Sequence, residues 1–238
     1  MSTLSLAFPK PLADKYRPAT VEEFCGLEKP KKVMSRFITA PYASEWLFEG
    51  PSGTGKTSMA LAICQALDGE LHHIPSQSCD LATVKQVCDL CHRFPFRWDV
   101  GKPARFHVVL VDEADRMSDA AQLAFLSKLD ATAKPPNTIF LFTCNSTERL
   151  EARFLSRCRR LTFSNYGMAA GIKTLLEKIW DKETDNPATE SYLNSCNGIT
   201  ARIVYLLEVD YDLGRFSVLH HWKYSDGPLT GPLAKGVN

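Results

Sequence analysis

The segment from Gly50 to Thr57 has the residue types and spacing that bind a nucleotide phosphate. It reads GPSGTGKT, which fits the pattern G-x-x-x-x-G-K-[ST]. In such a loop backbone N–H groups surround phosphate oxygens, the lysine reaches the β- and γ-phosphates and the hydroxyl binds Mg²⁺. An apolar run precedes the segment and eleven residues without Gly or Pro follow it, which suits the strand and helix that flank such a loop. We expect nucleotide contacts from Gly50, Pro51, Ser52, Gly53, Thr54, Gly55, Lys56, Thr57 and Ser58.

Two adjacent carboxylates follow the apolar run Val108–Val111. A carboxylate at the end of a buried strand, beside a phosphate loop, can hold Mg²⁺ through water, which predicts that role for Asp112 alongside Thr57. Glu113 comes one residue later and can activate the attacking water as a general base. The pair therefore favours an ATPase that needs ATP and Mg²⁺. The alternative is a solvated acidic loop that ends a core strand.

A polar residue, Asn145, ends the next apolar run in Phe142–Asn145. If the strand before it lies beside the strand before Asp112, its amide is placed near the γ-phosphate, where it can orient the attacking water. The alternative is an ordinary turn residue at the end of a strand.

Strands and helices alternate through the first two thirds of the chain. This alternation predicts an α/β fold with a parallel sheet and with ligands at the carboxyl ends of the strands. The residues between Pro95 and Pro103 are expected to form a loop. The expected strands are Trp46–Phe48, Leu71–Pro75, Phe106–Asp112, Thr138–Cys144 and Arg160–Phe163, and the expected helices are Lys29–Thr39, Ser58–Asp68, Ala82–Phe94 and Ser118–Leu129.

After Phe163 the pattern becomes helical. We expect helices at Ala169–Lys182, Ala188–Cys196 and Ala201–Asp210, with no strand between them. The predicted organisation is a nucleotide-binding core over residues 1–163, a small helical domain over 164–213 and a loose tail over 214–238.

Composition excludes several classes of protein. A net charge of +1 with 45% hydrophobic residues argues against disorder and against a strongly cationic nucleic-acid-binding protein. No apolar run is long enough for a membrane span, and Met1–Pro9 lacks the features of a secretory signal. Eight cysteines without small-scaffold spacing are expected to be reduced thiols, which predicts a cytoplasmic protein.

Together with these motifs, four further stretches make the sequence similar to AAA+ ATPases of the clamp-loader branch. They are Asp14–Pro18 (DKYRP), the acidic box Asp112–Asp115, Leu123–Leu129 followed by Lys134–Pro136, and Ser156–Cys158 (SRC). The resemblance implies a P-loop core with a five-stranded parallel sheet, a helical lid, and ATP bound between them. It also implies that Tyr16, Arg17 and Pro18 pack against adenine, and that Arg157 is an arginine finger that acts on a neighbouring subunit.

The same resemblance implies partners: identical or homologous AAA+ subunits in a ring or spiral, DNA, and a sliding clamp, with no membrane. The chain departs from the family pattern at three places. A lid arginine is expected at position 201, where Ala stands, so Arg202 either takes that role by a one-residue shift or the sensor is absent. Leu126 and Ser127 occupy positions where replication factor C has paired arginines that face DNA. Residues 215–238 are too few for a collar domain.

Two other functions stay open. One is a different AAA+ DNA motor or regulator, in branch migration, transposition or defence, which the missing collar favours. The other is a low-turnover, nucleotide-gated binding module, which the uncertain lid arginine favours and Glu113 disfavours.

Three cysteines raise the question of a zinc site. Cys79, Cys88 and Cys91 resemble three of the four ligands of the zinc module in the bacterial clamp-loader subunit, with Phe94 at the fourth position. A closed site would need His92, His72 or His73 instead. The spacing of Val84, Val87, Cys88 and Cys91 also matches one apolar helix face, and we favour core packing.

Overall fold

The computed structural model describes residues 12–130, 132–183, 207–210 and 215–218. The chain divides into two compact units. The larger one comprises residues 18–166, and the smaller one comprises residues 1–17 and 167–238. The first unit contains the phosphate loop, the acidic pair and Asn145.

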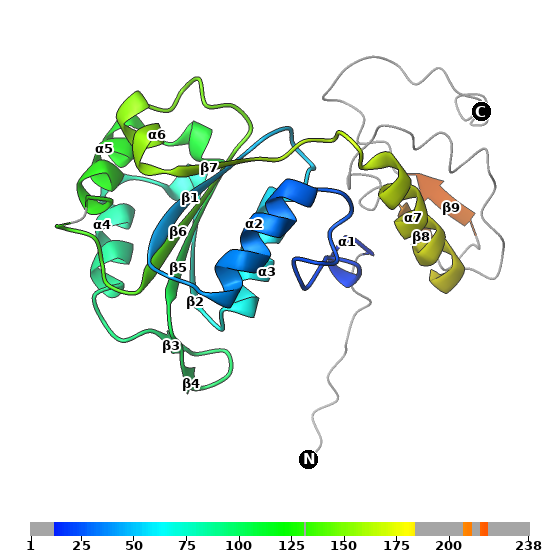
Figure 1. Ribbon diagram of the computed structural model, residues 1–238, viewed down its shortest axis with the longest axis horizontal. Helices are drawn as coiled ribbons and strands as arrows, with labels where there is room; N and C mark the ends of the chain where they lie inside the picture. The colour runs from blue at the N-terminus through cyan, green and yellow to red at the C-terminus, as the bar shows by residue number, and fades with distance from the viewer. Residues whose placement is uncertain (1–11, 131, 184–206, 211–214, 219–238) are drawn as a thin grey trace. The chain divides into compact units, whose positions relative to one another are not determined.

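The larger unit is built on a five-stranded parallel sheet (Figure 1). Its strands in spatial order are β2 (Glu70–Pro75), β5 (His107–Asp112), β6 (Thr138–Cys144), β1 (Ser44–Glu49) and β7 (Arg159–Thr162). All seven residues of β6 are buried, as is expected of a strand covered on both faces. The prediction of a five-stranded parallel α/β core is confirmed, with strand bounds shifted by at most a few residues.

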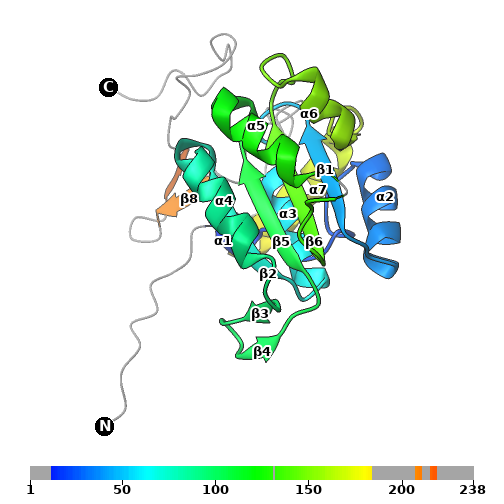
Figure 2. The same cartoon turned by 90° about the vertical axis from the view of Figure 1, so that its left-hand side faces the viewer.

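Helices cover both faces of this sheet. Figures 1 and 2 show α2 (Glu28–Thr39) and α3 (Lys56–Ala66) on one face, and α4 (Leu81–Leu90) and α5 (Asp119–Lys128) on the other. The second pair begins at side-chain caps: Asp80 accepts a hydrogen bond from the Thr83 N–H at 2.7 Å, and Ser118 accepts one from the Ala121 N–H at 3.2 Å.

Aromatic rings fill the layer between the sheet and α5. The ring of Phe142 meets Phe125 and Phe154 edge-on, with centroids 5.1 and 4.9 Å away, and all three side chains are fully buried. Phe154 belongs to α6 (Ala152–Arg157), a short helix that the sequence pattern did not predict, because six residues are too few to show a helical period.

The range Pro95–Pro103 differs from the predicted loop. It contains a short antiparallel hairpin in which β3 (Phe96–Arg97) pairs with β4 (Lys102–Pro103). Ion pairs of Asp68 with Arg97 and Lys102 tie both short strands to the turn after α3. Such two-residue strands carry no periodic signal, so the sequence showed only the turn residues.

The smaller unit contains α1 (Leu12–Lys15), α7 (Ala169–Glu183) and an antiparallel hairpin of β8 (Leu207–Asp210) and β9 (Arg215–Val218). The prediction that Ala201–Asp210 is helical was wrong for residues 207–210, and residues 215–218 of the predicted tail are also a strand. Apolar and polar residues alternate in Leu207–Asp210, which suits a strand. The predicted helix Ala188–Cys196 and Arg202 lie outside the described residues. No helix in the described part of the chain is long and apolar enough to cross a membrane.

Candidate nucleotide-binding site

The phosphate loop joins the carboxyl end of β1 to the first turn of α3. Gly50 has a φ of +149°, and a Cβ added there would lie 2.1 Å from the carbonyl oxygen of Phe163, so this position requires glycine. Gly55 precedes α3 with a φ of +90°, and the ring of Phe24 lies against it. No side chain caps the start of α3, which leaves its first N–H groups available to an anion.

Lys56 connects this loop to the neighbouring strand end. Its ammonium donates hydrogen bonds to the carbonyl oxygens of Gly50 and Pro51, at 2.7 and 2.8 Å, and to Oδ1 of Asn145 at 3.0 Å. Burial lowers the pKa of Lys56, while nearby acidic groups, including the Asp115 and Asp112 carboxylates, oppose that shift. An anion beside this ammonium would offset its desolvation.

Asp112 ends β5 and binds two hydroxyl groups. Its Oδ1 accepts hydrogen bonds from Thr57 Oγ1 at 2.7 Å and from Thr143 Oγ1 at 2.5 Å. The Thr57 hydroxyl and the Asp112 carboxylate are hard oxygen donors, the kind that Mg²⁺ prefers, so the residues present fit that ion. Sequence reasoning missed Thr143, although a threonine inside the apolar run before Asn145 was a usable signal.

Glu113 follows in a left-handed conformation, with a φ of +53°. Its N–H donates to Thr143 Oγ1 at 3.1 Å, and its carboxylate, 46% exposed, lies 3.4 Å from Nε of Arg116. The backbone turn therefore directs Glu113 away from the strand and leaves its carboxylate open to solvent. Two residues later, Oδ1 of Asp115 is buried and has no hydrogen-bond partner.

The strand order explains why these groups meet. Asn145 follows β6, which lies between β1, the strand before the phosphate loop, and β5, the strand that ends at Asp112, and β6 pairs with both. The interpretation of Asn145 required that β6 lie beside β5, and it does. Side-chain hydrogen bonds join Lys56 to Asn145 and the adjacent Thr57 to Asp112.

Arg157 lies at the end of α6 and makes a different set of contacts. Its Nε and Nη2 lie 2.9 and 2.7 Å from Oδ1 of Asp130, and its Nη1 donates to the carbonyl oxygen of Arg153 at 3.1 Å. Its side chain is 32% exposed. The guanidinium is thus held by an ion pair within its own chain.

The predicted adenine contacts are divided between the two units. Tyr16 and Arg17 belong to the smaller unit, where Arg17 pairs with Asp14 at 2.6 Å, and Pro18 begins the larger one. Their contact with adenine stays a prediction, as does the role of Arg202.

The cysteines Cys79, Cys88 and Cys91 are all buried in the apolar cluster beneath α4. Their burial agrees with packing as small hydrophobic residues. Burial raises the pKa of the Cys79 and Cys88 thiols to about 11, which keeps them protonated at neutral pH.

Comparison with known proteins agrees with this site. The model of the ATPase family associated with various cellular activities (AAA) matches residues 46–166. Replication factor C small subunit 1 of Pyrobaculum aerophilum is 34% identical over 154 residues, which cover 63% of this chain and 46% of that protein. Replication factor C subunit 4 of Homo sapiens is 33% identical over 168 residues, which cover 66% of this chain and 46% of that protein. The chain thus spans about half the length of these curated relatives.

Solved structures show the same fold. The Holliday junction branch migration motor RuvB of Thermotoga maritima superposes with a TM-score of 0.62 at 21% identity, over 81% of this chain and 63% of that one. At that identity the likeness concerns the fold alone. The family match, the replication factor C relatives and the assembled phosphate site lead to one conclusion: the chain belongs to the AAA ATPase family and is similar to replication factor C small subunits, which are clamp-loader subunits.

Proposed function

We propose that this chain is a Mg²⁺-dependent, ATP-hydrolysing subunit of an oligomeric clamp-loader-type assembly that works on DNA in the cytoplasm, by loading or remodelling a ring such as a sliding clamp. One observation carries the proposal: at the carboxyl edge of the sheet, Lys56 lies 3.0 Å from Asn145 and Thr57 lies 2.7 Å from Asp112. These are the groups needed to bind a triphosphate and to place a water molecule beside it.

Each residue has a distinct task in this proposal. Lys56 exchanges its carbonyl partners for the β- and γ-phosphates of ATP. Thr57 and Asp112 hold Mg²⁺, which supplies charge neutralisation at the phosphates when it is bound. Glu113 takes a proton from the attacking water, and its exposed carboxylate leaves room for that water. Asn145 turns its amide from Lys56 towards the same water.

Arg157 acts on the nucleotide of a neighbouring subunit. A guanidinium at that position stabilises the charge of the transition state and makes hydrolysis depend on assembly. In the isolated chain Asp130 holds this group at 2.7 Å, so assembly must exchange one anionic partner for another. A partly exposed ion pair of this kind costs little to break.

The first test is the ATPase rate per chain as a function of protein concentration, with and without primed DNA, while light scattering reports the mass. We expect the rate to rise as oligomers form and to rise again with DNA. A flat, DNA-independent rate from a monomer would contradict a shared site and would favour a nucleotide-gated binding module.

Action in a neighbouring subunit is tested by mixing variants. Arg157→Ala alone and Lys56→Ala alone should each hydrolyse ATP poorly. Mixed oligomers should recover part of the activity, because a Lys56→Ala chain supplies Arg157 to an intact phosphate loop. Arg153→Ala, one turn earlier on α6 and exposed, is the matched control and should keep wild-type activity. Absence of recovery in the mixture would contradict action between subunits.

A further inference from the structure

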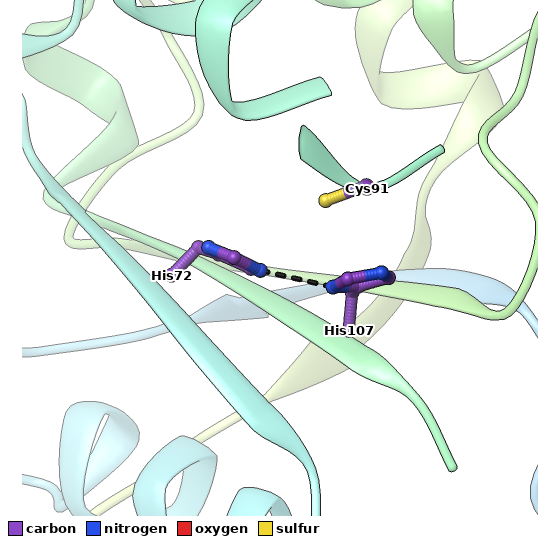
Figure 3. Close-up of side chains that lie close together, drawn as sticks. All are labelled: His72, Cys91 and His107. Carbon is purple, nitrogen blue, oxygen red and sulfur yellow. Dashed lines mark hydrogen bonds between the residues drawn. The ribbon is translucent and has the colours of Figure 1, made fainter. Parts of the chain in front are cut away.

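At the amino end of the strands, three side chains of the types that bind transition metals face one another (Figure 3). They are His72 on β2, His107 at the start of β5, and Cys91 at the C-cap of α4. Their potential ligand atoms all lie within 4.8 Å of one another. Cys79 and Cys88 are not part of this group.

Strand register brings the two histidines to one face of the sheet. Glu70 pairs with His107 across β2 and β5, and paired residues of neighbouring strands point to the same face. His72, two residues after Glu70, points to that face as well. The same face carries Val109, which belongs with Cys91 to the buried cluster beneath α4.

A hydrogen bond determines which nitrogen of His107 faces this group. Nε2 of His107 lies 2.9 Å from the carbonyl oxygen of Arg93, which can only accept, so Nε2 carries the proton. In the neutral ring the lone pair of Nδ1 is then directed at the other side chains of the group. Metal-binding histidines have this arrangement, in which the remote ring N–H is donated to a carbonyl.

The atoms around that lone pair are electron-rich. Nδ1 of His107 lies 3.0 Å from Nε2 of His72 and 3.1 Å from Oε2 of Glu70. Oε2 of Glu70 also lies 3.9 Å from Nε2 of His72, and it accepts a hydrogen bond from the N–H of Phe96. A proton on Nε2 of His72 can be donated either to Nδ1 of His107 or to Oε2 of Glu70. A cation bound among these atoms would accept a lone pair from each of them.

We propose that His72, His107 and Cys91 bind one Zn²⁺ ion, with Glu70 as the fourth ligand. Two imidazoles, one thiolate and one carboxylate form a ligand set that Zn²⁺ accepts in tetrahedral sites. With bonds of about 2.0 Å to nitrogen and 2.3 Å to sulfur, a tetrahedral ion spaces its ligand atoms by about 3.3–3.6 Å. The atoms of His72, His107 and Glu70 are 3.0–3.9 Å apart, and those of His72, His107 and Cys91 lie within 4.8 Å of one another, so side-chain rotations must bring Cys91 and Glu70 to that spacing. This ligand set shares only Cys91 with the three-cysteine pattern.

The position of the site makes it structural. His107 and Asp112 are the two ends of β5, five residues and therefore about 17 Å apart, so the metal lies far from the phosphate loop. The ion would tie the edge strand β2 to β5 and to the end of α4. The side chains of His72 and Glu70 are 12% and 18% exposed, which gives the ion a route from solvent.

Binding exchanges a proton for the metal. The S–H bond of Cys91 breaks, a Zn–S bond forms, and the proton goes to solvent, while the neutral histidines bind through lone pairs. Burial raises the pKa of the Cys91 thiol to about 12, so the free thiol is protonated at neutral pH. Each bound ion should therefore release about one proton, and the affinity should increase with pH.

The test uses the full, tag-free and nucleotide-free chain, stripped with a chelator and titrated with Co²⁺. We expect one Co²⁺ per chain, with the visible absorption of tetrahedral cobalt, a thiolate-to-cobalt charge-transfer band, release of about one proton, and displacement by Zn²⁺. Cys91→Ser should remove the charge-transfer band. His72→Gln, which changes the less buried histidine, should weaken binding at least about tenfold.

Matched controls separate this site from its rivals. His73→Gln alters the neighbouring, exposed histidine and should leave the Co²⁺ spectrum unchanged, as should Cys79→Ser and Cys88→Ser. Circular dichroism of each variant confirms its folding. Loss of the tetrahedral spectrum in Cys79→Ser or Cys88→Ser would move the metal to the cysteine set and overturn the proposal. Absence of any tetrahedral spectrum in the wild-type chain would also overturn the proposal. The contact between Glu70 and His107 would then be a structural contact without a metal.

Discussion

The two ends of the same sheet carry sites of opposite character. At the carboxyl ends, the phosphate site comes from short motifs that follow strands, with glycines at positive φ and the exposed carboxylate of Glu113. At the amino ends, the His72, His107 and Cys91 group comes from three separate segments and is mostly buried. Loops after parallel strands are free to carry chemistry, whereas residues at the strand starts lie against helices and serve packing.

This comparison predicts that the two ends are independent. Variants of the phosphate site should change nucleotide binding or turnover and leave metal binding intact. Variants of the histidine and cysteine group should change stability and metal binding and leave turnover intact. The following predictions test that separation, from the largest expected effect to the smallest.

The largest effect is expected from Arg157→Ala. An arginine finger contributes about 10³–10⁵-fold to hydrolysis, so the rate in the assembled state should fall by that order while the affinity for ATP stays near wild type. Steady-state turnover and equilibrium binding of a fluorescent ATP analogue measure the two quantities. A parallel loss of affinity would mean that Arg157 shapes its own subunit's site.

Gly50→Ala should disrupt the phosphate loop. The new Cβ would lie 2.1 Å from the Phe163 carbonyl oxygen, so we expect loss of ATP binding and a decrease of about 1–3 kcal/mol in the free energy of unfolding. Gly101→Ala is the matched control, because Gly101 also has positive φ, at +66°, but no atom within 4 Å of the added Cβ. Equal effects of the two changes in urea denaturation would show that the clash is not the cause.

Asp130→Ala should have a smaller and opposite effect. It frees Arg157 from an exposed ion pair worth at most about 1 kcal/mol, so turnover at low protein concentration should rise by no more than about fivefold. Asp89→Ala removes a comparable exposed pair with Lys128 and should leave turnover unchanged. A decrease in turnover after Asp130→Ala would show that Asp130 positions Arg157 productively.

The smallest effect concerns pH at the amino end. Burial lowers the pKa of His72 below its ordinary value of 6.5, so the unfolded chain takes up a proton before the folded chain does. The contribution of His72 to stability is therefore present above pH 6.5 and is lost as the pH falls through its folded value. Thermal unfolding in a chelator should show that the Tm of the wild-type chain falls by a few degrees on acidification. The decrease should be smaller in His72→Gln and the same as wild type in His73→Gln. Identical pH profiles for all three proteins would contradict this assignment.

Much of the phosphate site could be predicted from sequence because it depends on local pattern. Gly50–Thr57 contains its own turn chemistry, and Asp112 and Asn145 each mark the end of an apolar strand. Parallel strands end at one edge, so the meeting of these residues followed from the fold class. Thr143 was missed although it is a hydroxyl residue inside an apolar run, because only the strand order shows that it lies beside Asp112.

The amino-end group could not be predicted in the same way. That His72 meets His107 depends on the register of β2 with β5, and the hydrophobic pattern does not specify this. The hairpin of β8 and β9 was missed for a related reason, because four-residue strands are too short to separate a two-residue period from a helical one.

The measurement that tests the central claim most directly is single-turnover hydrolysis by Glu113→Gln beside wild type and the exposed control Glu28→Gln. We predict that Glu113→Gln binds ATP with near wild-type affinity but hydrolyses it about 10²–10⁴-fold more slowly, as loss of a general base requires. Glu28→Gln should match wild type in both respects. Wild-type turnover in Glu113→Gln would contradict the assignment of the carboxyl end of this sheet as an ATP-hydrolysing site that uses Glu113 as its base.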